Sequence, residues 1–270
     1  MKLKYLGTAA AEGFPAIFCN CDHCKAARAL GGKNIRTRSQ TLINSDLLID
    51  LPADTYMHFL QNGIEGDLIK YLVITHAHLD HLYRNELMMR IPPVYANSPR
   101  NEKLRVFCSG GTAKYLEKYP EAIEINVLKP FETARAGEYE LTALPARHMP
   151  GGEPFIYIIK GDKTLLYAHD TGYFFDEVFD YIEKNKLKFD FVSLDCTNGS
   201  LPISDEGGHM GFDNIDRVLK RLVLMGAVSD STVKYVNHFS HNANPRHDLF
   251  EEKARELGLA VSYDGCEVEF

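Results

Sequence analysis

The 270-residue sequence predicts a layered α/β sandwich in which two β-sheets face each other and helices cover their outer sides. Three observations favour this fold. Short apolar runs separated by turn signals dominate the first two thirds of the chain, helical periodicity occurs at three places, and strands and helices do not alternate as they would in a regular βαβ repeat. No linker divides the chain, so we expect residues 1–270 to form a single domain.

The predicted strands are short runs rich in apolar, β-branched and aromatic residues. They cover residues 3–7, 41–50, 70–76, 94–96, 125–131, 139–146, 154–170, 189–195, 233–239 and 261–270. Turn-forming residues at 44–46 and 161–162 divide two of these runs, which predicts a hairpin at each place. We also expect the runs at 125–131 and 139–146 to pair with each other.

Three segments have apolar residues at helical spacing, at about residues 54–62, 175–187 and 212–225. The last has the clearest apolar stripe, made of Ile215, Val218, Leu219 and Leu222. Asp213 is suited to cap its start and Gly226 to end it. These segments supply the helices of the predicted sandwich.

Composition and charge exclude several classes of protein. The formal charge of −7 disfavours an open positive face for long nucleic acids, whereas a small anionic substrate remains compatible. No apolar run is long enough to span a bilayer, and the first residues lack the apolar core of a signal peptide. We therefore expect a cytoplasmic protein with no membrane partner.

The strongest functional signal is the hexapeptide His-Ala-His-Leu-Asp-His at residues 76–81, which directly follows the apolar run 71–74. Four metal-binding side chains in six residues fit a tight loop at a strand end. His76 and His78 can point the same way, while Asp80 and His81 can turn to a second centre, so the spacing suits two neighbouring metal ions. A solvated polar loop is the alternative interpretation.

Two metal ions need further ligands, and three candidates follow other predicted strands. His148 comes after residues 140–145, Asp170 after 164–168, and His238 after 233–236. Imidazole and carboxylate ligands suit Zn, Mn or Fe, with Ni a further candidate, and the residues do not choose among these metals.

Three cysteines form a second cluster at residues 19–24. Cys19, Cys21 and Cys24 are too close together for a disulfide framework in a reducing compartment, and three thiolates make a partial shell for structural zinc. The fourth ligand must come from elsewhere: His23 is adjacent but poorly placed, and His241 lies three residues after His238. Free or buried cysteines are the alternative.

The hexapeptide followed by separate His, Asp and His residues resembles the metallo-beta-lactamase superfamily, whose members share a four-layer αββα sandwich. The resemblance implies that His76, His78 and His148 hold one metal ion. Asp80, His81 and His238 would hold the other, with Asp170 bridging the two.

Together, the cysteines, the hexapeptide and the segment Asn237-His238-Phe239-Ser240-His241 resemble PhnP-like phosphodiesterases of the carbon–phosphorus lyase pathway. That resemblance implies a structural zinc ion held by Cys19, Cys21, Cys24 and His241. It also implies a homodimer, which is in line with the frequency of such assemblies.

Two neighbouring cations lower the pKa of a shared water, so we expect a metal-bridging hydroxide to attack the substrate, with Asp80 among the catalytic residues as a metal ligand. A leaving alkoxide also needs a proton. His209, after Gly207 and Gly208, has the position of the general acid in related phosphodiesterases, and Asp195 could orient it. A capping or surface role is the alternative for both residues.

These features predict a metal-dependent phosphodiesterase acting on small cyclic esters, such as 1,2-cyclic ribose phosphate or 2',3'-cyclic nucleotides. A ribonuclease that processes tRNA 3' ends shares the hexapeptide, but this chain has no long basic insertion for gripping tRNA. Lactone or ester hydrolysis would use the same metals, and a pyrroloquinoline quinone biosynthesis protein has similar cysteines. Metal or ligand binding without catalysis is the alternative from another class.

Overall fold

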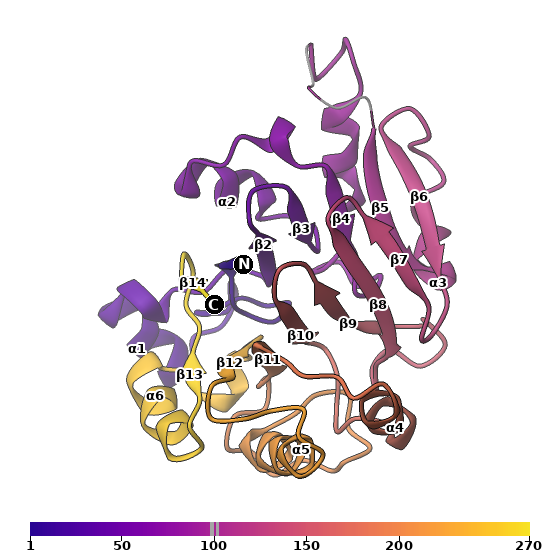
Figure 1. The fold of residues 1–270 in the computed structure, drawn as a ribbon. Coiled ribbons are helices and arrows are strands. Elements are labelled where there is room, and N and C mark those ends of the chain that lie inside the picture. The colour runs from indigo at the N-terminus through magenta and orange to yellow at the C-terminus, as the bar shows by residue number, and fades with distance from the viewer. Residues whose placement is uncertain (98–99, 101–102) are drawn as a thin grey trace.

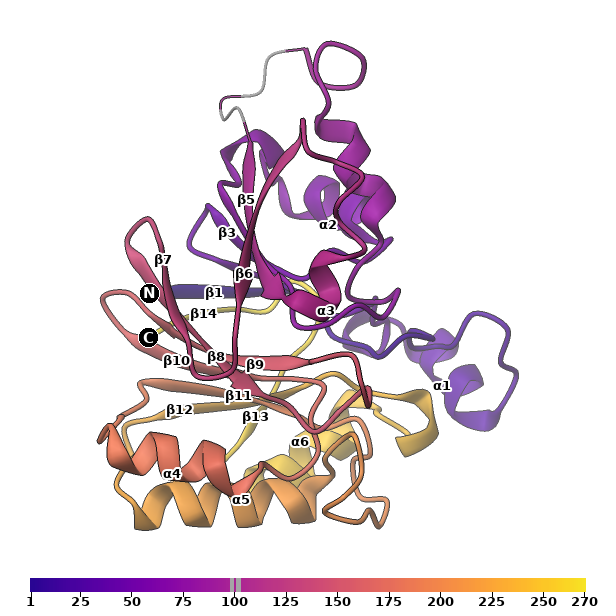
Figure 2. The same ribbon diagram turned by 90° about the vertical axis from the view of Figure 1, so that its right-hand side faces the viewer.

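The structure is a computed structural model that describes residues 1–97, 100 and 103–270. Two β-sheets are stacked face to face, and helices lie on the outer side of each sheet (Figures 1 and 2). This arrangement confirms the predicted αββα sandwich. Both termini lie at the same end of the molecule, where β1 and β14 are neighbours (Figure 2).

The first sheet has the strand order β14-β1-β2-β3-β4-β5-β6 in the described part of the chain. Its strands are β1 (Lys2–Gly7), β2 (Gln40–Ile43), β3 (Leu47–Ile49), β4 (Tyr71–Val73), β5 (Leu104–Ser109), β6 (Ile123–Leu128) and β14 (Glu267–Glu269). The strands from β14 to β3 are antiparallel, and those from β3 to β6 run parallel. The predicted turn at residues 44–46 joins β2 to β3.

The second sheet has the order β13-β12-β11-β10-β9-β8-β7 among the same residues. Its strands are β7 (Thr133–Ala136), β8 (Tyr139–Pro145), β9 (Phe155–Lys160), β10 (Thr164–Ala168), β11 (Phe191–Asp195), β12 (Val233–Asn237) and β13 (Ala260–Val261). The strands β7 to β10 are antiparallel, and the predicted turn at 161–162 joins β9 to β10. From β10 to β13 the strands run parallel.

Helices pack on the outer faces of both sheets. The α-helices are α1 (Asp22–Leu30), α2 (Thr55–Asn62), α3 (Gly110–Ala113), α4 (Asp176–Lys184), α5 (Phe212–Leu224) and α6 (His247–Glu256). Short 3-10 segments are η1 (Gly32–Asn34), η2 (Gly66–Leu68), η3 (Arg84–Arg90) and η4 (His241–Ala243). The predicted helices at 54–62, 175–187 and 212–225 correspond to α2, α4 and α5.

Apolar side chains fill the space between the layers. Tyr5 and Phe107 of the first sheet meet Tyr157 of the second in the central layer, where all three are buried. Val178 of α4 and Ile215 of α5 cover the outer face of the second sheet. Successive side chains of a strand point to opposite faces of its sheet. In a four-layer fold both faces of each sheet are covered, so the side chains on both faces must be apolar.

Some details differ from the sequence-based expectations. Residues 94 and 95 lie in a turn and 94–96 form no strand. Strand β6, within 125–131, does not pair with β8, because β6 belongs to the first sheet and β8 to the second, although the backbone N–H of Phe131 donates to the carbonyl oxygen of Ala143 at 2.7 Å. β8 pairs with β9 on one side and with β7 on the other, and β7 was not predicted because Thr133 and Arg135 interrupt its short apolar pattern. Helix α5 begins after Gly211, with Asp213 in its first turn and no capping bond from that side chain. In the part of the chain described, no helix has the length and apolarity to cross a membrane.

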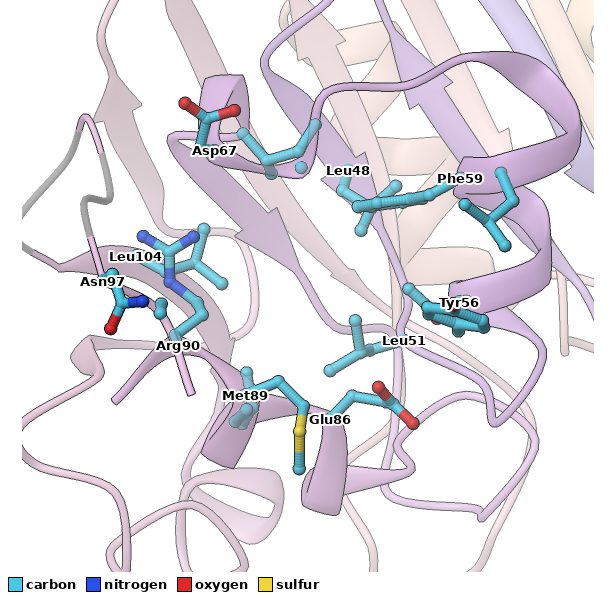
Figure 3. A pocket seen from close by; sticks show the side chains of 16 residues that line it. Leu48, Leu51, Tyr56, Phe59, Asp67, Glu86, Met89, Arg90, Asn97 and Leu104 are labelled. Atoms are coloured by element: carbon cyan, nitrogen blue, oxygen red, sulfur yellow. The ribbon is translucent and has the colours of Figure 1, made fainter. Parts of the chain in front are cut away.

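A cavity of about 860 Å³ opens on the outer side of the first sheet, between α2, η2 and η3 (Figure 3). Leu48 and Phe59 belong to its mainly apolar wall, and Glu86 and Arg90 bring charge to it. The wall residue Leu51 donates its backbone N–H to the carbonyl oxygen of His81 at 2.8 Å. The cavity therefore lies behind the hexapeptide loop, although none of the described residues lining it is a predicted metal ligand.

Candidate metal centre

The predicted metal ligands lie on loops that leave the carboxyl ends of strands in both sheets. The loop after β4 carries His76, His78, Asp80 and His81, the loop after β8 carries His148, and Asp170 and His238 follow β10 and β12. The structure brings all seven side chains together at one edge of the sandwich. Asp170 and His238 have positive φ angles of 53° and 63°, a conformation that costs energy in non-glycine residues and is often found at functional sites.

His76, His78 and His148 form the first group. Nε2 of His76 lies 2.9 Å from Nδ1 of His78, which is 3.1 Å from Nε2 of His148. The remaining ring nitrogens of two of them are anchored: Nδ1 of His148 donates to the carbonyl oxygen of Gly208 at 3.0 Å, and Nδ1 of His76 lies 3.0 Å from the hydroxyl of Thr75. Such contacts fix the ring and leave Nε2 available to a metal ion.

Asp80, His81 and His238 form the second group. Nε2 of His81 lies 3.2 Å from Oδ2 of Asp80 and 3.3 Å from Nε2 of His238. The Nδ1 atoms of the two histidines are again engaged, that of His81 with Asp50 at 2.7 Å and that of His238 with the hydroxyl of Thr197 at 2.8 Å. Each group therefore offers three converging ligand atoms.

Asp170 lies between the two groups. Its Oδ2 is 3.1 Å from Nε2 of both His81 and His238, whereas its Oδ1 is 3.7 Å from Nε2 of His148 and 3.9 Å from Nε2 of His76. The carboxylate is buried, and Oδ2 receives no hydrogen bond in the part of the chain that the structure describes. Because a buried carboxylate oxygen without a donor is costly, this orphaned atom fits a bridging metal ligand.

The pKa shifts of several of these groups favour the protonation state that can bind a metal ion. Burial lowers the pKa of His76 and of His148, which keeps their rings neutral. Burial opposes ionisation of Asp170, but the charges of His238 and His81 outweigh it and hold the pKa of that carboxyl well below its usual range. His81 behaves differently: burial opposes its charge, but attraction by Asp170 raises its pKa, so metal binding must displace a proton there.

His209 and Asp195 form a pair beside the second group. Nδ1 of His209 lies 2.9 Å from Oδ2 of Asp195, and its ring stacks on that of His238 with centroids 5.5 Å apart. Burial opposes the charge of His209, but attraction by Asp195 and their hydrogen bond raise its pKa to about 9. Asp195 is itself buried and accepts backbone N–H groups from Asp170 and Thr197.

Sequence reasoning assigned no supporting role to Asp50, Thr75, Thr197 or Gly208, each of which contacts a predicted ligand. Asp50 accepts hydrogen bonds from His81 and from the N–H of Thr75, and Thr197 anchors His238. Asp50 carried a usable signal, because it directly follows an apolar strand in the same way as Asp170 does. The threonines had no comparable signal, since a hydroxyl is common in loops.

The cysteine cluster lies beside the loop that follows His238. The thiols of Cys19, Cys21 and Cys24 and the ring of His241 present ligand atoms that all lie within 4.8 Å of one another. Nδ1 of His241 is 3.5 Å from Sγ of Cys24. Nδ1 of His23 instead faces the carbonyl oxygen of His241 at 3.2 Å, so of the two candidates His241 is the one directed at the thiols.

The other cysteines and histidines have structural surroundings. Cys108, Cys196 and Cys266 are buried, as expected for core residues. His169 is next to Asp170 in sequence, but its ring faces away from the centre, with Nε2 2.7 Å from the hydroxyl of Ser193. The structure thus places His169 in the core, apart from the histidines that are predicted to bind metal.

The fold and the two ligand groups define a class of proteins, the metal-dependent hydrolases with an αββα sandwich. A family model described as the beta-lactamase superfamily domain matches residues 49–233. The chain therefore belongs to the beta-lactamase superfamily, a fold family whose members are generally metal-dependent hydrolases. The His and Asp clusters are compatible with divalent metal ions.

Solved structures with the same fold cover the whole of this chain. A diphosphatase from the PhnP family is 22% identical with a TM-score of 0.76, over 100% of this chain and 97% of that one. Zn²⁺-bound PqqB from Methylobacterium extorquens is 15% identical with a TM-score of 0.75, over 100% of both chains. The short form of human tRNase Z is 13% identical with a TM-score of 0.67, over 100% of this chain and 99% of that one. No curated protein sequence matches the chain.

Proposed function

We propose that the protein is a binuclear metal-dependent phosphodiesterase that hydrolyses small cyclic phosphodiesters, such as 1,2-cyclic ribose phosphate or 2',3'-cyclic nucleotides. The observation that carries the proposal is the position of Asp170, whose two oxygens face two separate three-ligand groups. A single carboxylate in that position suits a bridge between two metal ions, and paired ions are common in enzymes that cleave phosphate esters.

The ligand set fits two divalent cations of the Zn, Mn, Fe or Ni type. His76, His78 and His148 would hold one, Asp80, His81 and His238 the other, and Asp170 both. When bound, such a pair of ions supplies an activated water and neutralises charge on the phosphate oxygens. The anchored second nitrogens of His76, His148, His81 and His238 hold those four rings in place before any ion arrives.

The chain also supplies a proton donor. Asp195 holds Nδ1 of His209, so the proton on Nε2 of that ring is the one available to a leaving alkoxide. About a quarter of the His209 side chain is exposed (27%), which lets the ring reach both the centre and solvent. Asp195 acts through His209 as a positioning residue.

The cysteine cluster belongs to the same proposal as a structural zinc site. Cys19, Cys21, Cys24 and His241 would hold the ion, and they supply the four ligands that a structural zinc ion needs. His241 is three residues beyond His238, and η4 lies directly after the loop that carries that ligand. A zinc ion here would therefore tie the N-terminal segment to one wall of the metal centre.

The test is turnover by manganese-loaded protein of a 2',3'-cyclic nucleotide, a linear diester, a phosphomonoester and a lactone. We expect hydrolysis of the cyclic ester to exceed that of the other three. A diphosphate ester is a useful fifth substrate, because one structure with this fold is that of a diphosphatase from the PhnP family. Activity on the lactone alone would reassign the reaction, and cleavage of a tRNA precursor alone would favour the processing ribonuclease.

A further inference from the structure

Two clefts open beside the first ligand group, and both begin at Ala77, which lies between the ligands His76 and His78. The Arg84 cleft has a volume of about 270 Å³ and contains Tyr83, Arg84 and Asn85. The Lys114 cleft has a volume of about 290 Å³ and contains Lys114, Met149 and Gly151. Tyr115 also lines both clefts. These spaces are distinct from the apolar cavity of Figure 3, which shares none of these residues.

The clefts are positively charged in an acidic protein. Among the described residues that line them, Arg84 and Lys114 are the charged side chains, and no carboxylate is present. Glu153 lies on the neighbouring loop, but its carboxylate accepts the N–H of Gly111 at 2.8 Å and does not line either cleft. In a chain with a net charge of −7, two clefts lined by cations and by no carboxylate among the described residues favour an anionic ligand.

The Lys114 cleft has firmly positioned walls. A Cβ atom on Gly111 would meet the carbonyl oxygen of Gly152 at 2.7 Å, so the start of α3 and the loop after β8 touch backbone to backbone. That loop also carries His148, which belongs to the first ligand group. The loop therefore has one end at the metal ligands and the other against the segment that carries Lys114 and Tyr115.

Tyr115 adds a surface of a different kind. Its side chain is 45% exposed, although apolar residues on either side of it in sequence, Ala113 and Leu116, are buried. An exposed aromatic ring between two cations can stack on a planar ring while the cations bind a phosphate, a combination common in nucleotide recognition.

We propose that the two clefts form a subsite for the non-reacting part of the substrate, in which Tyr115 stacks on a nucleobase and Arg84 and Lys114 bind a second phosphate group. The inference rests on the proposed function and narrows its substrate class. Among cyclic nucleotides, the preferred ones would carry an additional phosphate away from the scissile ester.

Binding of hydrolysis products tests the subsite independently of turnover. The full-length, metal-loaded protein is titrated calorimetrically with adenosine 3'-monophosphate and adenosine 3',5'-bisphosphate. We expect the bisphosphate to bind about tenfold more tightly, as charge-assisted phosphate contacts allow. The double variant Arg84→Met/Lys114→Met should lose this preference and keep the Kd of the monophosphate. Lys118→Met, an exposed lysine outside the clefts, is the matched control and should behave as wild type.

Variants of Tyr115 test the stacking surface. Tyr115→Ala should weaken binding of both adenosine ligands several-fold, and Tyr115→Phe should restore it because the ring is retained. Equal binding of the two ligands by wild type, or an unchanged preference in the double variant, would overturn the subsite. If the preference depends on both cations while no cyclic ester is hydrolysed, the subsite stands and the proposed reaction fails.

Discussion

Asp50 and His81 are in direct contact beneath the metal centre, with Oδ2 of the carboxylate 2.7 Å from Nδ1 of the ring and both side chains fully buried. Asp50 has a φ of 64° and also accepts the backbone N–H of Thr75, the residue before His76. The carboxylate thus holds one ligand of the second group and the backbone that precedes the first. Orientation of this kind is expected to contribute to metal affinity.

Asp50→Asn should weaken metal binding without removing a ligand. An amide can present an N–H where the carboxylate accepts one, so His81 would lose its fixed tautomer and ring orientation. We expect metal affinity to fall about 10- to 100-fold, measured by competition with a chromogenic chelator. Asp180→Asn, on the exposed side of α4, is the control and should retain wild-type affinity. Equal affinity in both variants would limit Asp50 to a packing role.

His209→Ala should keep both active-site metal ions and lose turnover. The ring is not among the ligands assigned to either ion, and general acid catalysis is worth about 10²- to 10⁴-fold. The loss should be much smaller for a p-nitrophenyl ester, whose leaving group needs no proton. Metal content by mass spectrometry and kcat on both substrates check the prediction. An equal loss on the two substrates would assign His209 a structural role.

Asp195→Asn should move the pH profile of kcat/KM. Attraction by Asp195 contributes to the raised pKa of His209, about 9, so removing that charge lowers the pKa. A general acid is active only when protonated, and activity should therefore be lost at lower pH in the variant than in wild type. The alkaline limb is measured on a cyclic nucleotide. An unshifted limb with reduced kcat would show that Asp195 does not act through His209.

Cys21→Ser should lose about one zinc equivalent and much of the thermal stability. A thiolate is replaced by a poor zinc ligand, and the binding free energy of a structural zinc ion contributes to folding. The measurements are metal content and Tm. Cys108→Ala is the matched control, because Cys108 is buried in the core away from both ligand clusters and its removal should lower Tm without changing the metal count. A wild-type metal count in Cys21→Ser would argue against the zinc site.

The sequence predicted the layers, and the His and Asp residues that it singled out as metal ligands lie together in the structure, because both depend on local patterns. Apolar runs of strand length marked the strands that end at the centre, and His and Asp residues directly after them marked the loops. Apolar runs do not predict which strands pair with each other, because pairing is decided by tertiary structure. β6 and β8 are close in sequence but belong to different sheets, a division that the chain between them does not reveal.

The supporting residues escaped sequence reasoning for a related reason. Thr75, Thr197 and Gly208 act through a hydroxyl or a carbonyl oxygen, and their importance depends on which ring nitrogen they meet. Lys114 and Tyr115 escaped because they lie just after α3, more than thirty residues beyond the hexapeptide. Only the fold places them beside Ala77.

Because His58 is buried in its neutral form, the free energy of unfolding should decrease as the pH falls from 6.5 towards 4. The ring is 1% exposed and lies between Gln40 and Thr37, with Nδ1 and Nε2 each 2.7 Å from a partner. Burial lowers its pKa from 6.5 to about 4 in the folded state. The unfolded chain therefore binds more protons in this window, so the free energy of unfolding decreases as the pH falls through it and is unaffected by His58 above 6.5.

The contribution is measured as the difference between wild type and His58→Gln in urea unfolding, without metal, at pH 7.5 and pH 5. At pH 7.5 the variant should be less stable by about 1–2 kcal/mol, because it loses hydrogen bonds to the ring. At pH 5 the free energy of unfolding of the wild type should be about 2 kcal/mol lower than at pH 7.5 because of His58, as the linkage between pKa and stability requires. The difference in the free energy of unfolding between wild type and His58→Gln should therefore become smaller or change sign at pH 5. A gap that stays constant between the two pH values would show that the folded His58 titrates near its ordinary pKa.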